Sequence, residues 1–196
     1  MRKVILQEFV SLNGLASGPN DRVDFVPGAM HGDQRFGREQ LKLIDSIDMI
    51  LLGRVTYRMF SEHFPKVTKG DEKTFADKVN ATPKIAFSKR LDRAPWGNWD
   101  EANVVKNSAA SEVAKLKQQP GKDMLIWGSI SVAQSLMNQT LIDEYQLVVC
   151  PVVLGGGRPL FRDKVDKFEL KLLETKPFDR GAVLLKYRPA SARSAD

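Results

Sequence analysis

The sequence is poor in the residues that build metal centres and disulfide frameworks. Its 196 residues include one cysteine, Cys150, and two histidines, His31 and His63. A single thiol cannot form an internal disulfide, and it cannot supply the several thiolates of a structural zinc site. Two histidines leave little material for a multi-histidine centre. We therefore expect no metal in the functional site, and we expect Cys150, which lies in an apolar run, to be a buried core thiol.

Long apolar runs are also lacking. The apolar residues 4–6 follow a basic N-terminus but end at Gln7, which is too short for the hydrophobic region of a signal peptide. No stretch approaches the ~20 apolar residues that a membrane-spanning helix needs. We expect a cytoplasmic protein that does not bind a membrane.

The charge present is modest and mixed in sign. Thirty Lys and Arg residues against 24 Asp and Glu residues give a net charge of +6, and 42% of the residues are hydrophobic. This composition is typical of a globular domain and too apolar for a disordered chain. No nucleic-acid recognition motif accompanies the charge, so we expect no nucleic-acid partner. A small anionic ligand fits the charge at least as well.

Short apolar runs alternate with amphipathic stretches along the chain. The runs predict strands over residues 4–9, 48–53, 84–88, 103–105, 124–127, 145–149, 168–174 and 182–187. Strands alternating with helices favour an α/β fold with a mainly parallel sheet, and the last two strands predict an antiparallel edge. We expect one domain over residues 1–188, a frayed tail over 189–196, and a long polar loop over 11–33 that borders the site.

The segment Gly53-Arg54-Val55-Thr56 follows a buried strand and opens a helix. Ligands of open α/β sheets bind at the carboxyl ends of strands, and a helix N-terminus there offers backbone N–H groups to an anion. The Arg54 guanidinium adds a fork suited to phosphate. The alternative is a tight turn at Gly53, a solvated Arg54 and a capping Thr56.

Two further strand ends carry similar groups. Gly128 lets a ligand approach the backbone, and Ser129 or Ser131 could cap the next helix or bind pyrophosphate. Ser88-Lys89-Arg90 offers a hydroxyl and two cations, although a solvated charged loop would look the same. Together, the three strand ends favour a ligand with several phosphates. The glycine run 155–157, followed by Arg158, could line a pocket or form a flexible turn.

Six motifs occur in an order that resembles a known superfamily. They are SLNG at 11–14, LGRVTY at 52–57, FS at 87–88, WGS at 127–129, LIDE at 141–144 and PVVLGGGRPLF at 151–161. The sequence resembles the dihydrofolate-reductase-like superfamily over residues 4–187. It is most similar to stand-alone relatives of the C-terminal reductase domain of the riboflavin-biosynthesis deaminase-reductase.

The resemblance implies a three-layer α/β fold that binds NADPH and forms a homodimer. Its central sheet would be mostly parallel, with antiparallel C-terminal strands and flanking helices. The cofactor would contact Gly14, Gly53, Arg54, Thr56, Ser88, Lys89, Arg90, Gly128, Ser129, Ile130 and Ser131. Asn13, Gly155 and Gly156 would flank the substrate.

The resemblance predicts an NADPH-dependent reductase of a C=N or C=O group in a small heterocycle, such as a pterin or a pyrimidine riboflavin precursor. Asn13 stands where the family commonly has Asp, which favours the alternative of a non-catalytic nucleotide-binding protein of the same fold. Besides Asn13, the catalytic candidates are Asp33 and Glu39, since a carboxyl with a raised pKa could donate a proton. Both could equally be surface carboxylates.

Overall fold

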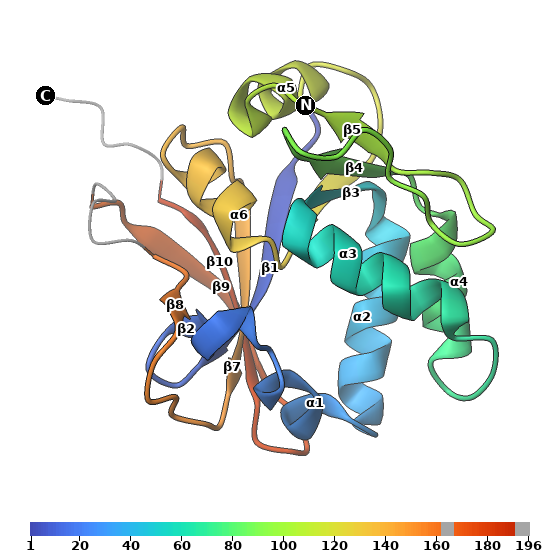
Figure 1. Cartoon of the computed structure of the whole chain (residues 1–196). Helices are drawn as coiled ribbons and strands as arrows, with labels where there is room; N and C mark the ends of the chain where they lie inside the picture. The colour runs from blue at the N-terminus through green and yellow to red at the C-terminus, as the bar shows by residue number, and fades with distance from the viewer. Residues whose placement is uncertain (162–166, 191–196) are drawn as a thin grey trace, which may run out of the picture.

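An eight-stranded sheet runs through the centre of the molecule (Figure 1). The computed structural model describes residues 1–161 and 167–190. The strands, in spatial order, are β5 (Asn103–Val105), β4 (Lys84–Phe87), β3 (Ile47–Gly53), β6 (Asp123–Trp127), β1 (Val4–Ser11), β7 (Glu144–Cys150), β10 (Val183–Pro189) and β9 (Leu170–Pro177). All pairings from β5 to β7 are parallel, and β10 is antiparallel to both of its neighbours. The predicted fold class is confirmed.

Helices cover both faces of this sheet and make three layers (Figure 1). One face packs against α2 (Gln34–Ser46), α3 (Arg54–His63) and α4 (Lys73–Ala81), and the other against α5 (Ala109–Leu116) and α6 (Ile130–Met137). The apolar run at the centre of β3 is explained by burial on both faces of the sheet. Leu51 packs toward α5 and α6, whereas Ile50 and Leu52 pack toward the other helices, and none of the three is more than 1% exposed.

The segment predicted as one long loop contains three short elements. They are β2 (Leu15–Ser17), the 3₁₀ turn η1 (Pro19–Asp21) and α1 (Phe25–Met30). Strand β2 pairs antiparallel with β8 (Arg158–Pro159), which lies more than 100 residues further along the chain. The prediction that the whole segment is a loop is wrong, and β2 was missed because its partner is distant in sequence and local propensity does not reveal it.

Other boundaries differ from the prediction by a few residues. Strand β3 begins at Ile47, one residue before the predicted start, and β9 begins at Leu170, two residues after it. A second 3₁₀ turn, η2 (Phe64–Lys66), follows α3. Cys150 is fully buried, as predicted, and burial raises the pKa of its thiol to about 11. Residues 191–196 of the expected tail lie outside the described residues. Within the part of the chain that is described, no helix combines the length and apolarity needed to cross a membrane.

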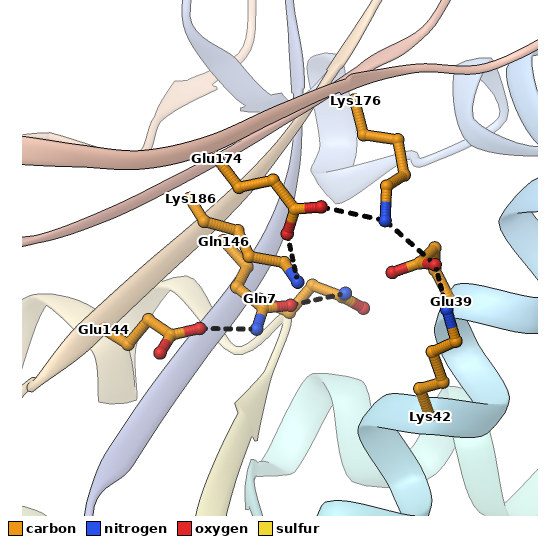
Figure 2. A network of polar contacts seen from close by, with 8 residues as sticks. All are labelled: Gln7, Glu39, Lys42, Glu144, Gln146, Glu174, Lys176 and Lys186. Atoms are coloured by element: carbon orange, nitrogen blue, oxygen red, sulfur yellow. Dashed lines mark hydrogen bonds and ion pairs between the residues drawn. The ribbon is translucent and has the colours of Figure 1, made fainter.

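A row of polar side chains crosses one face of the sheet near α2 (Figure 2). Gln7, Gln146, Lys186 and Glu174 occupy matching register positions on β1, β7, β10 and β9. Glu174 forms ion pairs with Lys186 at 2.8 Å and with Lys176 at 2.9 Å. These two cations lower the pKa of Glu174 to about 2.

We expect the substitution Glu174→Gln to destabilise the protein by about 1 kcal/mol near neutral pH, because the ion pairs are partly solvated. A carboxyl whose pKa is lowered on folding stabilises the folded state above its unfolded pKa of 4.5, and this stabilisation is lost as pH falls toward about 2. Urea unfolding of both proteins over this pH range measures the difference. Glu62→Gln on α3, which removes a carboxylate with no ion pair among the described residues, should show no such dependence. A pH-independent difference for Glu174→Gln would contradict the prediction.

Candidate functional site

A cavity of about 690 Å³ opens at the carboxyl ends of β4, β3, β6 and β1. This volume lies within the usual range for small-molecule and cofactor sites. All of the predicted cofactor residues except Gly14 line it. Because the carboxyl ends of parallel strands meet at one edge of the sheet, motifs far apart in sequence come together here.

Two helix N-termini point at the cavity. Helix α3 begins directly after β3, and two residues separate β6 from α6; neither helix has a side-chain cap. The Gly53 N–H donates to Ser129 Oγ at 2.9 Å, which ties the two helix starts together. Arg54 lies in the first turn of α3 and lines the cavity. The arrangement offers backbone N–H groups, two helix dipoles and a guanidinium to an anion.

Of the two alternatives for Ser129, the structure excludes the capping of α6 by its side chain. Its hydroxyl accepts from Gly53 and lies 3.4 Å from the Trp127 carbonyl oxygen. Gly128 adopts φ +59°, and a Cβ there would lie 3.4 Å from Thr56 Cγ2. Only a residue without a side chain leaves this space between the two helix starts open.

The Ser88-Lys89-Arg90 segment forms the far end of the cavity, after β4. Ser88 Oγ accepts from the Arg90 N–H at 3.1 Å and from the Leu91 N–H at 3.2 Å, which holds the segment in a turn. Lys89 and Arg90 are exposed, and neither forms an ion pair with any described residue. This end of the cavity therefore presents two unpaired cations.

The opposite end of the cavity is apolar. Its walls are formed by Phe9, Val23, Val26, Pro27, Met59, Phe60, Phe64 and Trp127. The charged pair at this end, Arg158 and Asp21, is joined at 3.0 Å, so the two charges offset each other. The cavity thus joins a cationic end to an aromatic end.

Glu8 lines the cavity and is a residue that the sequence analysis missed. Its side chain lies on the same face of β1 as the buried Leu6 and Val10 and is only 5% exposed. Burial raises the pKa of Glu8 to about 8. A hydrogen bond from the Phe9 N–H lowers the pKa, but this effect is smaller than that of burial. The sequence does contain a signal for this residue: Glu8 lies between Leu6 and Val10 in the strand alternation, which places a carboxyl on an apolar face.

Asn13, Gly14, Gly155 and Gly156 are not among the residues that line the cavity. The Asn13 amide donates to the Leu154 carbonyl at 2.9 Å and accepts from the Leu154 N–H at 3.1 Å. Gly14 has φ +81° and donates to Ser11 in a tight turn. These contacts hold the loop after β1 against the glycine run, so the structure gives Asn13 a role in joining loops.

The expectation of a raised pKa at Asp33 or Glu39 is wrong. Asp33 caps α2. Burial raises the pKa of its carboxyl, but the hydrogen bonds that the carboxylate accepts, among them those from the N–H groups of Phe36 and Asp179, outweigh this effect and lower the pKa. Burial also raises the pKa of Glu39, and its ion pairs with Lys42 and Lys176 outweigh that effect. Both carboxylates are ionised near neutral pH and neither lines the cavity.

The fold and this cavity define an α/β protein whose strand ends border a cavity with two helix N-termini and several cationic side chains. Dihydrofolate reductase from Enterococcus faecalis, solved in complex with NADP(H), shares the fold with a TM-score of 0.59 at 11% identity, over 95% of this chain and 96% of that chain. The fold is therefore dihydrofolate-reductase-like.

The family model described as the RibD C-terminal domain matches residues 2–184, and the chain belongs to this family. It is 33% identical over 187 residues to the uncharacterized protein YyaP of Bacillus subtilis (strain 168), covering 95% of this chain and 94% of YyaP. A putative riboflavin biosynthesis protein from Shewanella sp. PV-4 has a TM-score of 0.75 at 20% identity, over 96% and 99% of the two chains. Together, these relationships support an oxidoreductase-type enzyme with a reductase-like role.

Proposed function

We propose that the protein is an NADPH-dependent reductase of a small heterocycle. The observation that carries this proposal is the cavity, which joins two uncapped helix N-termini and unpaired cations to an aromatic end. The cavity spans the ends of four neighbouring strands, β4, β3, β6 and β1. Three strand spacings amount to about 14 Å, which suits an extended dinucleotide.

The residues present fit such a cofactor. Gly53 and Gly128 leave open a cradle that side chains would narrow: a Cβ at Gly53 would lie 3.4 Å from Val132 Cγ2. The first turns of α3 and α6 would hold the pyrophosphate, and Arg54 would hold the 2′-phosphate together with the Ser88 turn and its two cations. NADPH, when bound, supplies a hydride. The protein's part is to orient both reactants and to exclude water.

The aromatic end suits a flat ring with no net charge. Phe60 and Trp127 meet edge to face with their ring centroids 4.8 Å apart, and Phe9 lies at the opposite wall next to Glu8. A C=N or C=O group of a pterin or pyrimidine fits this end, and the name of the Shewanella relative agrees with a riboflavin-precursor type of substrate. The substrate class is thus a heterocycle that accepts a hydride.

The test measures cofactor binding and turnover separately. We expect NADPH to bind more tightly than NADH in a fluorescence titration, and NADPH absorbance to fall with one or more members of a panel of pterins, pyrimidine riboflavin precursors and small carbonyl compounds. Binding without turnover of any panel member would favour a non-catalytic nucleotide-binding protein. Absence of NADPH binding would refute both functions.

A further inference from the structure

Glu8 stands at the junction of the two ends of the cavity. It lies on β1, the last of the four strands, where the phosphate-binding end meets the wall that contains Phe9. Glu8 Oε1 is 4.0 Å from the position that a Cβ at Gly128 would occupy. A hydride donor that follows the strand ends and an acceptor at the aromatic end would meet beside this carboxyl.

The carboxyl of Glu8 has unused hydrogen-bonding capacity. Its Oε1 accepts from the Phe9 N–H at 3.2 Å, and its Oε2 has no hydrogen-bond partner among the described residues. Ser17 Oγ, which lines the same cavity, is also buried and without such a partner. Buried polar atoms are costly to leave unsatisfied, so two of them in one cavity indicate a polar ligand.

Gln7, the residue before Glu8, is a buried polar residue of β1 whose side chain belongs to a hydrogen-bonded network. Gln7 projects from the opposite face, where its amide donates to Gln146 Oε1, which belongs to the polar row of Figure 2. Gln146 in turn donates to Glu144 at 2.7 Å. Glu8 has no such side-chain partner, although it is almost as buried as Gln7. Gln7 Oε1 also lacks a partner among the described residues, but Gln7 does not line the cavity. The polar row of Figure 2 therefore does not account for Glu8.

The protonation state of Glu8 suits a proton donor. With a pKa of about 8, caused by burial, the carboxyl is mostly protonated at neutral pH and carries an O–H group. The other charged or titratable groups that line the cavity are Arg54 and His63 on α3, Asp21 on η1, Lys89 and Arg90 after β4, and Arg158 on β8. None of them forms an ion pair with Glu8, and Asp21 is already paired with Arg158.

We propose that Glu8 is the acid that protonates the substrate during reduction, a role that rests on the proposed function. The substrate carbon gains a hydride from NADPH, the C=N or C=O π bond breaks, and its electron pair takes the proton from the Glu8 carboxyl. The products are NADP⁺, the reduced substrate and a Glu8 carboxylate, which regains its proton from water. Ser17 Oγ orients the same polar end of the substrate.

The test compares Glu8→Gln with Glu8→Asp and with Glu144→Gln on the adjacent strand. Glutamine keeps the volume and a hydrogen-bond donor but cannot release a proton. We expect kcat of Glu8→Gln to fall by about 10²–10⁴-fold, with NADPH affinity within about threefold of wild type. Glu8→Asp should keep part of the activity, and Glu144→Gln should remain fully active. Wild-type kcat/KM should decline as pH rises through about 8, and that of Glu8→Gln should not.

A second readout needs neither cofactor nor substrate. An acid whose pKa is raised on folding destabilises the folded state as pH rises from its unfolded pKa of 4.5 to about 8. The melting temperature of Glu8→Gln should therefore rise relative to wild type over this range. The proposal would be overturned if the melting temperatures of the two proteins had the same pH dependence. It would also be overturned if the wild type reduced a panel member and Glu8→Gln did so at the same rate. A wild type that reduces no panel member overturns the proposed function and the acid role together.

Discussion

Replacing Gly128 with valine is expected to abolish NADPH binding, raising Kd by at least ~100-fold, which corresponds to about 2.7 kcal/mol of binding free energy. Gly128 has φ +59°, and its missing Cβ would lie 3.4 Å from Thr56 Cγ2. The branched carbons of valine would occupy the space between the starts of α3 and α6, where we place the phosphates. Fluorescence titration with NADPH measures the loss.

The left-handed backbone conformation also predicts a loss of stability, about 1–2 kcal/mol for a residue with a Cβ. Gly70→Val is the matched control, because Gly70 has φ +83°, lies outside the cavity, and faces open space where a Cβ would point, with no neighbouring side chain within 4 Å. It should lose similar stability and keep NADPH affinity. If Gly128→Val binds NADPH as tightly as wild type, the phosphates lie elsewhere.

The substitution Arg54→Ala is expected to weaken NADPH binding by about ten- to a hundredfold and to reduce the preference for NADPH over NADH. A charge-assisted hydrogen bond to phosphate contributes roughly 1.5–3 kcal/mol, which corresponds to this range of affinities. Arg54 is half-buried in the first turn of α3, so its guanidinium acts together with the helix dipole. Titration of wild type and variant with both cofactors, at about 0.15 M salt, tests the assignment.

Arg58→Ala provides the control on the same helix. Arg58 lies one turn after Arg54, is exposed and does not line the cavity. Both variants remove one positive charge, so an equal loss of affinity would indicate a long-range charge effect without direct contact. A wild type with equal affinities for NADPH and NADH would contradict the placement of Arg54 beside a phosphate that only NADPH carries.

Local sequence patterns were sufficient to predict the sheet and the cationic half of the site. The apolar run before Gly53 and the amphipathic run after it define a strand that leads into a helix, and the same pattern recurs at Gly128. Parallel strands end at one edge of the sheet, so these positions could be placed together without coordinates. Arg54 and the segment 88–90 follow from the same rule, because they come directly after strands.

Only the tertiary structure shows which polar side chains already have hydrogen-bond partners within the protein. Asn13 and Asp33 looked like catalytic candidates, but their partners Leu154 and Asp179 lie more than 100 residues away in sequence. In the sequence, Glu8 is an ordinary strand residue. In the structure it is buried, because β1 lies between β6 and β7 and contacts β2. Burial and hydrogen-bond partners come from segments distant in the chain, and they set the pKa of a carboxyl. The sequence alone therefore located the cationic end of the cavity, and only the packing of the chain showed which carboxyl in the cavity has a raised pKa.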